Sequence, residues 1–286
     1  TVMIQEIRIK NYLSFRDEAV LSFEATKDTT FEECQVVNVT PKVRLLRFAL
    51  IYGANASGKS NLLNAMDFLC GFWFDKKSDI DEETGVLPFL LDTETPNEPS
   101  EFNIKFFVDD KRYWYTLVLN DKQVIKENLY VYNSVQPSLV FSRELDGTAS
   151  LIKLNASLVK ANATIVEQLN VKCLSNMSFF AARNQVNCSL AYIDEVRDWM
   201  KNNMMPIIEP GTRMFEYAGK QMEKNAELKA YILDFVHKAD YNITDVYTER
   251  EKVPIPDFVK TSIMEDKDIP EKTKEKMLAD NAIERL

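Results

Sequence analysis

The sequence predicts an α/β fold that carries an antiparallel β-subdomain and a helical insertion. Three patterns indicate this fold: an apolar run that leads through a glycine-rich turn into helical spacing, alternating segments joined by short acidic turns, and helical spacing near the C-terminus. We expect one domain over residues 1–187, with the glycine-rich turn and the β-subdomain. We expect a mainly helical subdomain or insertion over residues 188–286.

The N-terminal part predicts three strands and a helix. Val2–Lys10 alternates between apolar and polar residues, and a second strand is expected at Ala19–Glu24. Leu45–Tyr52 is nearly continuously apolar, which is typical of a strand buried on both faces. Helical spacing follows at Asn61–Phe74, directly after the glycine-rich turn.

The middle of the chain predicts the antiparallel β-subdomain. The strand-like segments are Glu101–Val108, Arg112–Asn120, Val124–Asn133 and Leu139–Glu144. The connections between the first three, residues 109–111 and 121–123, contain only three residues each, and such short connections join strands as hairpins.

The C-terminal part predicts helices. Apolar residues recur at three-to-four spacing over Ala191–Met205 and Arg213–Ala239. Val253–Pro256 interrupts this pattern with two prolines, and an amphipathic, charged helix is expected over Pro270–Leu286.

Composition excludes several classes of protein. With 45% hydrophobic and 28% charged residues the chain is typical of globular proteins. No run approaches the roughly 18 apolar residues of a membrane helix, and the N-terminus lacks the regions of a secretory signal, so we expect a cytoplasmic protein without membrane association. The net charge of −9 argues against wrapping of nucleic acid, and we interpret the basic cluster Lys42, Arg44 and Arg47 as a solvated face.

Cysteine and histidine usage excludes further chemistry. The four cysteines, Cys34, Cys70, Cys173 and Cys188, are far apart and form no C-x-x-C pair, so they indicate neither a zinc site nor a disulfide framework. His237 is the single histidine, which excludes Ser-His-Asp catalysis and a multi-histidine metal site.

Residues Gly53–Ser60 match the pattern G-x-x-x-x-G-K-[ST] at every fixed position. In such a loop the glycines let backbone N–H groups point at phosphate oxygens, Lys59 reaches the β- and γ-phosphates, and the Ser60 hydroxyl binds Mg²⁺. The sequence therefore predicts a P-loop that binds ATP with Mg²⁺. The residues expected at the nucleotide are Gly53, Ala54, Asn55, Ala56, Ser57, Gly58, Lys59, Ser60 and Asn61.

Two segments together resemble a known family. Ile7–Phe15 followed by Gly53–Asn61 resembles the opening of ABC-type ATPases of the SMC/RecF/OLD-like group, in particular bacterial ATP-binding proteins of the abortive-infection type. The resemblance implies a P-loop NTPase with an ABC-type head lobe that acts in DNA repair or phage defence. It also implies a homodimer through the nucleotide face, with ATP between one P-loop and the other subunit's signature motif, that controls an effector protein or DNA.

The same resemblance implies further site residues. Ser178–Asn187 is an apolar, strand-like run that ends in a polar turn, and Gln185 in this turn is the candidate glutamine that touches Mg²⁺ and the attacking water. An ordinary surface glutamine is the alternative. Asn11, Ser14 and Phe15 are expected near the nucleotide, although Phe15 also fits a core position.

The segment Leu190–Glu195 resembles in sequence the strand that carries the catalytic carboxylates of such ATPases. However, Leu190, Ile193, Val196 and Met200 continue at three-to-four spacing, which predicts a helix whose Asp194 and Glu195 do not reach the nucleotide.

Neither a signature motif nor a convincing carboxylate strand is found, so we expect the chain to be a piece that lacks the second lobe. A divergent protein is the alternative. Two alternatives to an ATPase stay open. One is a nucleotide-binding regulatory module that does not hydrolyse ATP. The other is a P-loop kinase, which is less favoured because a kinase P-loop normally lies very near the N-terminus.

Overall fold

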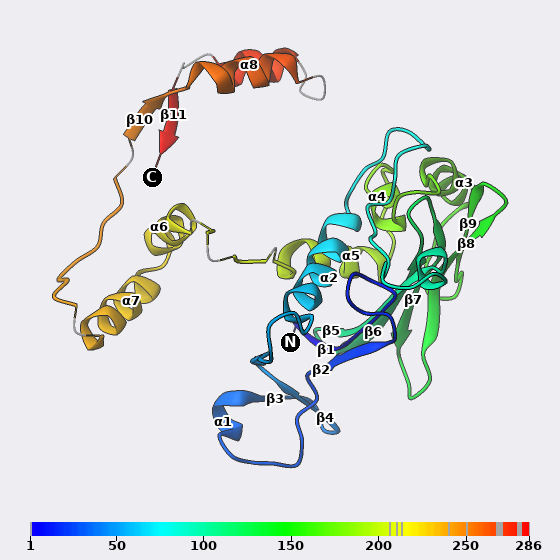
Figure 1. Cartoon of the computed structure of the whole chain (residues 1–286), viewed down its shortest axis with the longest axis horizontal. Coiled ribbons are helices and arrows are strands. Elements are labelled where there is room, and N and C mark those ends of the chain that lie inside the picture. Colours follow the sequence, from blue (N-terminus) through cyan, green and yellow to red (C-terminus); the bar gives the residue numbers. More distant parts are fainter. Residues whose placement is uncertain are drawn as a thin grey trace. The chain divides into compact units, whose positions relative to one another are not determined.

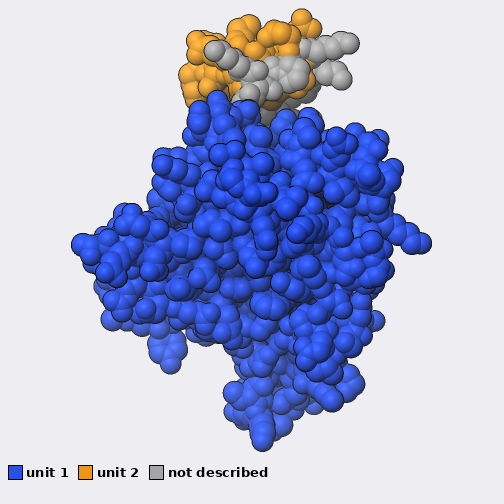
Figure 2. Space-filling model, turned by 90° about the vertical axis from the view of Figure 1, so that its right-hand side faces the viewer, with its two compact units in different colours: residues 1–207 blue, residues 208–286 orange. Residues whose placement is uncertain are grey.

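The computed structural model describes residues 2–205, 207–209, 211–212, 214–239, 241–249, 251–266, 271–278 and 282–285. The chain divides into two compact units, Thr1–Ile207 and Ile208–Leu286, which Figure 2 colours separately. The division falls after Ile207 and not after residue 187 as expected, because helix α5 (Ile193–Asn203) packs on the sheet of the first unit.

The first unit is built on one large antiparallel sheet (Figure 1). Within the described residues this sheet has seven strands in the order β2-β1-β5-β6-β7-β8-β9. Its strands are β1 Val2–Lys10, β2 Ala19–Ser22, β5 Ser100–Val108, β6 Lys111–Leu119, β7 Val124–Tyr132, β8 Ser138–Asp146 and β9 Ala149–Leu154. Strand β1 pairs with β5, so the segment that contains the P-loop is a long excursion between neighbouring strands.

The alternation of apolar and polar residues in the sequence corresponds to alternating burial of side chains along the strands. On β6, Tyr113, Tyr115, Leu117 and Leu119 are fully buried, while the residues between them are partly exposed. The β5–β6, β6–β7 and β7–β8 hairpins confirm the predicted β-subdomain. Strand β9 is an additional strand that the sequence did not indicate, and it pairs with β8.

Helices α2 (Lys59–Phe72), α3 (Ala163–Lys172), α4 (Phe179–Arg183) and α5 lie against this sheet (Figure 1). Aromatic pairs hold three of them to it. The centroid distances are 5.3 Å for Phe68 of α2 with Phe102, 4.0 Å for Phe179 of α4 with Phe141, and 4.0 Å for Trp199 of α5 with Phe106. Each such pair contributes about 0.5–1.5 kcal/mol beyond the area it buries. The predicted helix after the P-loop is confirmed as α2.

The strand expected at Leu45–Tyr52 is present only at Leu45 and Leu46, so this prediction is wrong for most of its length. Strand β4 (Val43–Leu46) ends early. It pairs with β3 (Val36–Thr40), which follows the short helix α1 (Glu32–Gln35), and its other edge makes backbone hydrogen bonds with residues 23–25, which follow β2. Residues 48–52 form neither helix nor strand, and Leu50 and Tyr52 are 81% and 93% exposed. Among the described residues, 48–52 therefore carry the apolar pattern without pairing to a strand.

The strand-like run expected at Ser178–Asn187 is also wrong, because it contains helix α4. The Ser178 hydroxyl accepts a hydrogen bond from the Ala181 backbone N–H at 3.0 Å, which caps the start of the helix. Phe179 and Phe180 are fully buried. A run that is apolar on every side does not distinguish a buried strand from a buried helix by its pattern.

The second unit contains α6 (Phe215–Lys224), α7 (Ala226–Lys238), β10 (Glu251–Pro254), α8 (Asp257–Glu265), α9 (Glu271–Leu278) and β11 (Ala282–Arg285). The single helix expected from Arg213 to Ala239 is divided at Asn225, whose side chain caps α7 by accepting from the Leu228 N–H at 3.0 Å. The helix expected over Pro270–Leu286 is confirmed only as α9, because Ala282–Arg285 forms β11, which pairs with β10. Arg213, Pro270 and Leu286 themselves lie outside the described residues.

The carboxylate of Glu6 on β1 makes stability depend on pH. Hydrogen bonds from Arg8 and from Lys105 lower the pKa of Glu6 from 4.5 to about 2. The ionised form is thus favoured in the folded state, so its contribution is present above pH 4.5 and lost as the pH falls towards 2. Because Glu6 and its partners Arg8 and Lys105 are partly exposed, we expect these interactions to add only about 0.2–1 kcal/mol to the free energy of unfolding. Urea unfolding of wild type and Glu6→Gln, followed by tryptophan fluorescence, checks this: the difference between them should shrink on acidification, and a constant difference contradicts it.

Candidate functional site

The P-loop lies at the surface, between the exposed apolar residues 48–52 and the first turn of α2. Its second glycine, Gly58, has φ +87°, in the left-handed region that side chains disfavour. Ala56 also has a positive φ, 61°, which is an uncommon conformation for a residue with a Cβ and stores strain in the loop. This sequence of backbone conformations turns the chain sharply into the helix.

Lys59 is folded across the loop. Its ammonium group donates to the carbonyl of Gly53 at 2.9 Å and to that of Ala54 at 2.6 Å. The Ser57 hydroxyl lies 3.5 Å from the same nitrogen. These contacts hold the Lys59 ammonium group at the opening of the loop. A bound phosphate group would replace the two carbonyls as the partner of this ammonium group.

The N-terminus of α2 adds to this charge. The helix has 14 residues, Gly58 is its N-cap without a side-chain cap, and its first turn contains no acidic residue. Its first backbone N–H groups and its dipole therefore favour an anion at the loop. Ser60 is exposed in this first turn, where a hydroxyl can serve as a ligand for Mg²⁺.

Asn61, the last residue expected at the nucleotide, is bound to other side chains. Its amide nitrogen donates to the Ser14 hydroxyl at 2.9 Å, and its amide oxygen accepts from Asn64 at 3.3 Å. Their place near the nucleotide stays a prediction, but Ser14 and Phe15 lie against the P-loop segment. Asn11 does not: it is fully buried and binds backbone groups of the loop that precedes β5.

Gln185 lies in the turn after α4. Its side chain makes one weak contact with the preceding helix: its amide nitrogen lies 3.4 Å from the Ala181 carbonyl of α4. Together with Glu167, Gln168 and other residues of α3 it lines a hollow of about 560 Å³. Among the described residues that line this hollow, none belongs to the P-loop, so a role of Gln185 at Mg²⁺ stays a prediction.

Asp194 and Glu195 lie in the first turn of α5, which confirms the predicted helix. Asp194 accepts from Arg183 at 2.9 Å and from the Leu190 N–H at 2.8 Å, while Glu195 pairs with Lys111 at 2.7 Å. Both carboxylates therefore form ion pairs with other side chains of the first unit. The Arg183–Asp194 pair, which ties α4 to α5, was not foreseen from the sequence.

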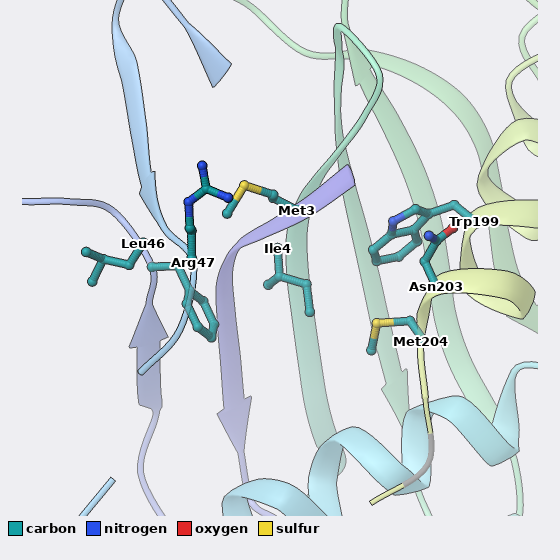
Figure 3. Close-up of a pocket in the computed structure, with 8 residues that line it drawn as sticks. Met3, Ile4, Leu46, Arg47, Trp199, Asn203 and Met204 are labelled. Atoms are coloured by element: carbon teal, nitrogen blue, oxygen red, sulfur yellow. The ribbon is translucent and has the colours of Figure 1, made fainter. Parts of the chain in front are cut away.

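A second hollow, of about 250 Å³, lies next to the end of β4 (Figure 3). Leu46 and Arg47 border one side of it, and Trp199, Asn203 and Met204 at the end of α5 border the other, with Met3 and Ile4 of β1 between them. It is mainly apolar, and no P-loop residue is among its described lining.

The described residues contain no group of three or more histidine, cysteine, aspartate or glutamate side chains able to hold a metal ion. The P-loop fits a triphosphate through its left-handed glycine, its lysine and a free helix N-terminus. For Mg²⁺ it offers the Ser60 hydroxyl, and the nucleotide's own phosphates would supply further oxygen ligands.

The comparison with known families agrees with this geometry. Residues 48–153 match the family described as "AAA domain, putative AbiEii toxin, Type IV TA system". The match supports an ATP-binding P-loop protein related to abortive-infection proteins. It begins at the exposed apolar run and extends through α2 to β9. No curated protein matches the chain. Among the described residues, no helix is long and apolar enough to cross a membrane.

Proposed function

We propose that this chain is the ATP-binding part of an ABC-type ATPase of the SMC/RecF/OLD-like group that acts in phage defence or DNA repair. The observation that carries this proposal is the P-loop, in which left-handed Gly58 leads directly into α2 and Lys59 lies across the loop. A loop of this geometry presents backbone N–H groups and one positive charge to the β- and γ-phosphates.

In this proposal the residues have separate roles. The backbone of Gly53–Ser60 binds the phosphates, Lys59 neutralises their charge, and Ser60 binds Mg²⁺, with Gln185 as a further candidate for Mg²⁺ and the attacking water. The bound ATP supplies the reactive γ-phosphate. Attack by water on it depends on positioning and on charge stabilisation.

We also propose that the nucleotide face pairs with a second copy of the chain and that nucleotide-dependent pairing controls an effector protein or DNA in the cytoplasm. The family match to a toxin–antitoxin type of AAA domain supports a role in defence. The exposed apolar side chains of Phe48, Leu50, Ile51 and Tyr52, next to the P-loop, support a covered surface there.

A regulatory module that binds ATP without hydrolysing it is the second candidate. One observation favours it: Asp194 and Glu195, the acidic pair that resembles catalytic carboxylates, are engaged by Arg183 and Lys111.

We expect the purified chain to bind ATP but to release phosphate far more slowly than about 1 s⁻¹, the lower end of typical enzyme turnover. The sequence offers neither a signature motif nor a convincing catalytic carboxylate. The loss of one such group, which stabilises charge or orients water, typically lowers the rate by about 10²–10³. Steady-state phosphate release measures this, with Lys59→Ala as the control for contaminating ATPases. A Lys59-dependent turnover near 1 s⁻¹ contradicts the expectation and requires another carboxylate at the site.

A further inference from the structure

The turn between β1 and β2, residues 11–16, lies directly on the P-loop. The Ser14 hydroxyl accepts a hydrogen bond of 2.9 Å from the Asn61 side chain in the first turn of α2. A methyl group placed on Gly58 would lie 2.9 Å from the Ser14 oxygen and 3.5 Å from the Phe15 ring. Ser14 and Phe15 thus close one side of the loop at Gly58, whose φ of +87° lies in the left-handed region.

This turn is firmly rooted in the core. The buried Asn11 side chain donates to the carbonyls of Thr95 and Glu98, both at 2.8 Å, and accepts from the Phe89 N–H at 2.9 Å. Residues Tyr12 and Phe15 close the turn with two backbone hydrogen bonds, at 2.9 and 2.8 Å. A turn with so many fixed groups holds its tip, Ser14, in one place.

The turn also contacts α2 one helical turn further on. Tyr12 is 5% exposed, and its hydroxyl donates to the carbonyl of Asn64 at 3.2 Å. Its ring packs against Phe68 of the same helix with a centroid distance of 5.7 Å. The first residues of α2 form the end of the P-loop. The turn therefore holds the N-terminal half of this helix at two points, through Tyr12 and through Ser14 at the tip of the turn.

We propose that Ser14 is a positioning residue for ATP binding: acting through Asn61, it fixes Gly58 and the first turn of α2 in the conformation that binds phosphate. This inference rests on the proposed function. Phosphate binding requires several backbone N–H groups to converge, and a loop ordered in advance loses less entropy when the ligand arrives. The Ser14 hydroxyl accepts the hydrogen bond from Asn61, and through this bond it acts on the first turn of α2.

Calorimetric titration with ATP and Mg²⁺ tests this on the full chain. Removing one neutral hydrogen bond should weaken binding by Ser14→Ala about threefold to tenfold. Ser14→Thr keeps the hydroxyl and should stay within about twofold of wild type. Ser134→Ala is the matched control, because Ser134 is exposed and its hydroxyl makes a single bond, to the Gln136 carbonyl, in the turn between β7 and β8.

A double-mutant cycle separates positioning from simple loss of contacts. Ser14→Ala and Asn61→Ala remove the same hydrogen bond, so the double variant should bind ATP about as weakly as Asn61→Ala alone. The midpoint of urea unfolding of Ser14→Ala should equal that of Ser134→Ala, since Ser14 is exposed.

The failure of this inference and the failure of the proposed function give different results. If wild type does not bind ATP, or Lys59→Ala binds it equally well, the proposed function is wrong. If binding depends on Lys59 but Ser14→Ala binds like wild type, the inference alone is wrong. It is likewise overturned if Ser14→Thr is as weak as Ser14→Ala, if the two substitutions are additive, or if the weaker binding comes with an equal loss of stability.

Discussion

Lys59→Ala is expected to weaken binding of ATP with Mg²⁺ by about tenfold to a hundredfold. A charge-assisted hydrogen bond contributes about 1.5–3 kcal/mol, and each 1.4 kcal/mol corresponds to a factor of ten in affinity. The substitution should leave stability nearly unchanged, because the partners of Lys59, the carbonyls of Gly53 and Ala54, are exposed and can bind water instead.

Isothermal titration calorimetry measures this loss. Lys126→Ala is the matched control: Lys126 is a half-exposed lysine of β7 whose ammonium group lies 3.7 Å from Glu144. It should bind ATP like wild type. Equal affinities for wild type, Lys59→Ala and Lys126→Ala would show that ATP does not bind through the P-loop.

Arg143→Ala is expected to cost about 3–5 kcal/mol of folding free energy in the first unit, because it leaves a buried carboxylate without its charged partner. The Arg143 and Glu127 side chains are 1% and 0% exposed and pair at 2.9 Å. Burial raises the pKa of Glu127, and the charge of Arg143 opposes this shift.

The same network fastens the far end of α2. Glu127 accepts hydrogen bonds from the Tyr115 hydroxyl at 2.9 Å and from the Phe179 N–H at 2.8 Å. The neighbouring Ser178 hydroxyl donates to the carbonyl of Trp73 at 2.8 Å, directly after α2. Loss of Arg143 therefore loosens the segment that precedes α4 together with the end of the helix that begins at the P-loop.

Urea unfolding followed by tryptophan fluorescence measures this cost. The three tryptophans, Trp73, Trp114 and Trp199, all lie in the first unit, so the signal reports on that unit. Arg16→Ala, which removes an exposed pair with Asp17, should change the unfolding free energy by less than about 1 kcal/mol. Glu127→Gln keeps the shape of the side chain and should lower the free energy of unfolding by about 1.5–3 kcal/mol. This variant therefore provides the test if Arg143→Ala does not fold. Costs for both variants as small as that of Arg16→Ala would contradict the account.

Local signals explain what the sequence could predict. The hairpins of β5 to β8 follow from alternating residues and short turns, and α5 follows from apolar residues three and four apart, both of which act between near neighbours. The P-loop was found because its chemistry requires fixed residues at fixed spacing. For α4 and for the break at Asn225, capping residues were present but were outweighed by the apolar pattern.

Contacts between distant parts of the chain explain the rest. The apolar run Leu45–Tyr52 satisfies every local requirement of a buried strand, yet pairing needs a neighbouring strand that no local pattern specifies. Ser14 and Asn61 are 47 residues apart, so their hydrogen bond was not visible in the spacing of either motif. Asn11 was expected at the nucleotide from a resemblance, whereas its burial and its bonds to backbone carbonyls give it a structural role.

The most direct test of a phosphate-binding loop is the dependence of affinity on the number of phosphates. Calorimetric titrations of the wild-type chain with ATP, ADP and AMP, each with Mg²⁺, separate recognition of the phosphates from recognition of the base. In the proposed site Lys59 and the N-terminus of α2 bind the β- and γ-phosphates. ATP and ADP should therefore bind, and AMP should bind at least about a hundredfold more weakly than ATP. An AMP affinity equal to that of ATP would contradict the assignment of Gly53–Ser60 as the nucleotide site.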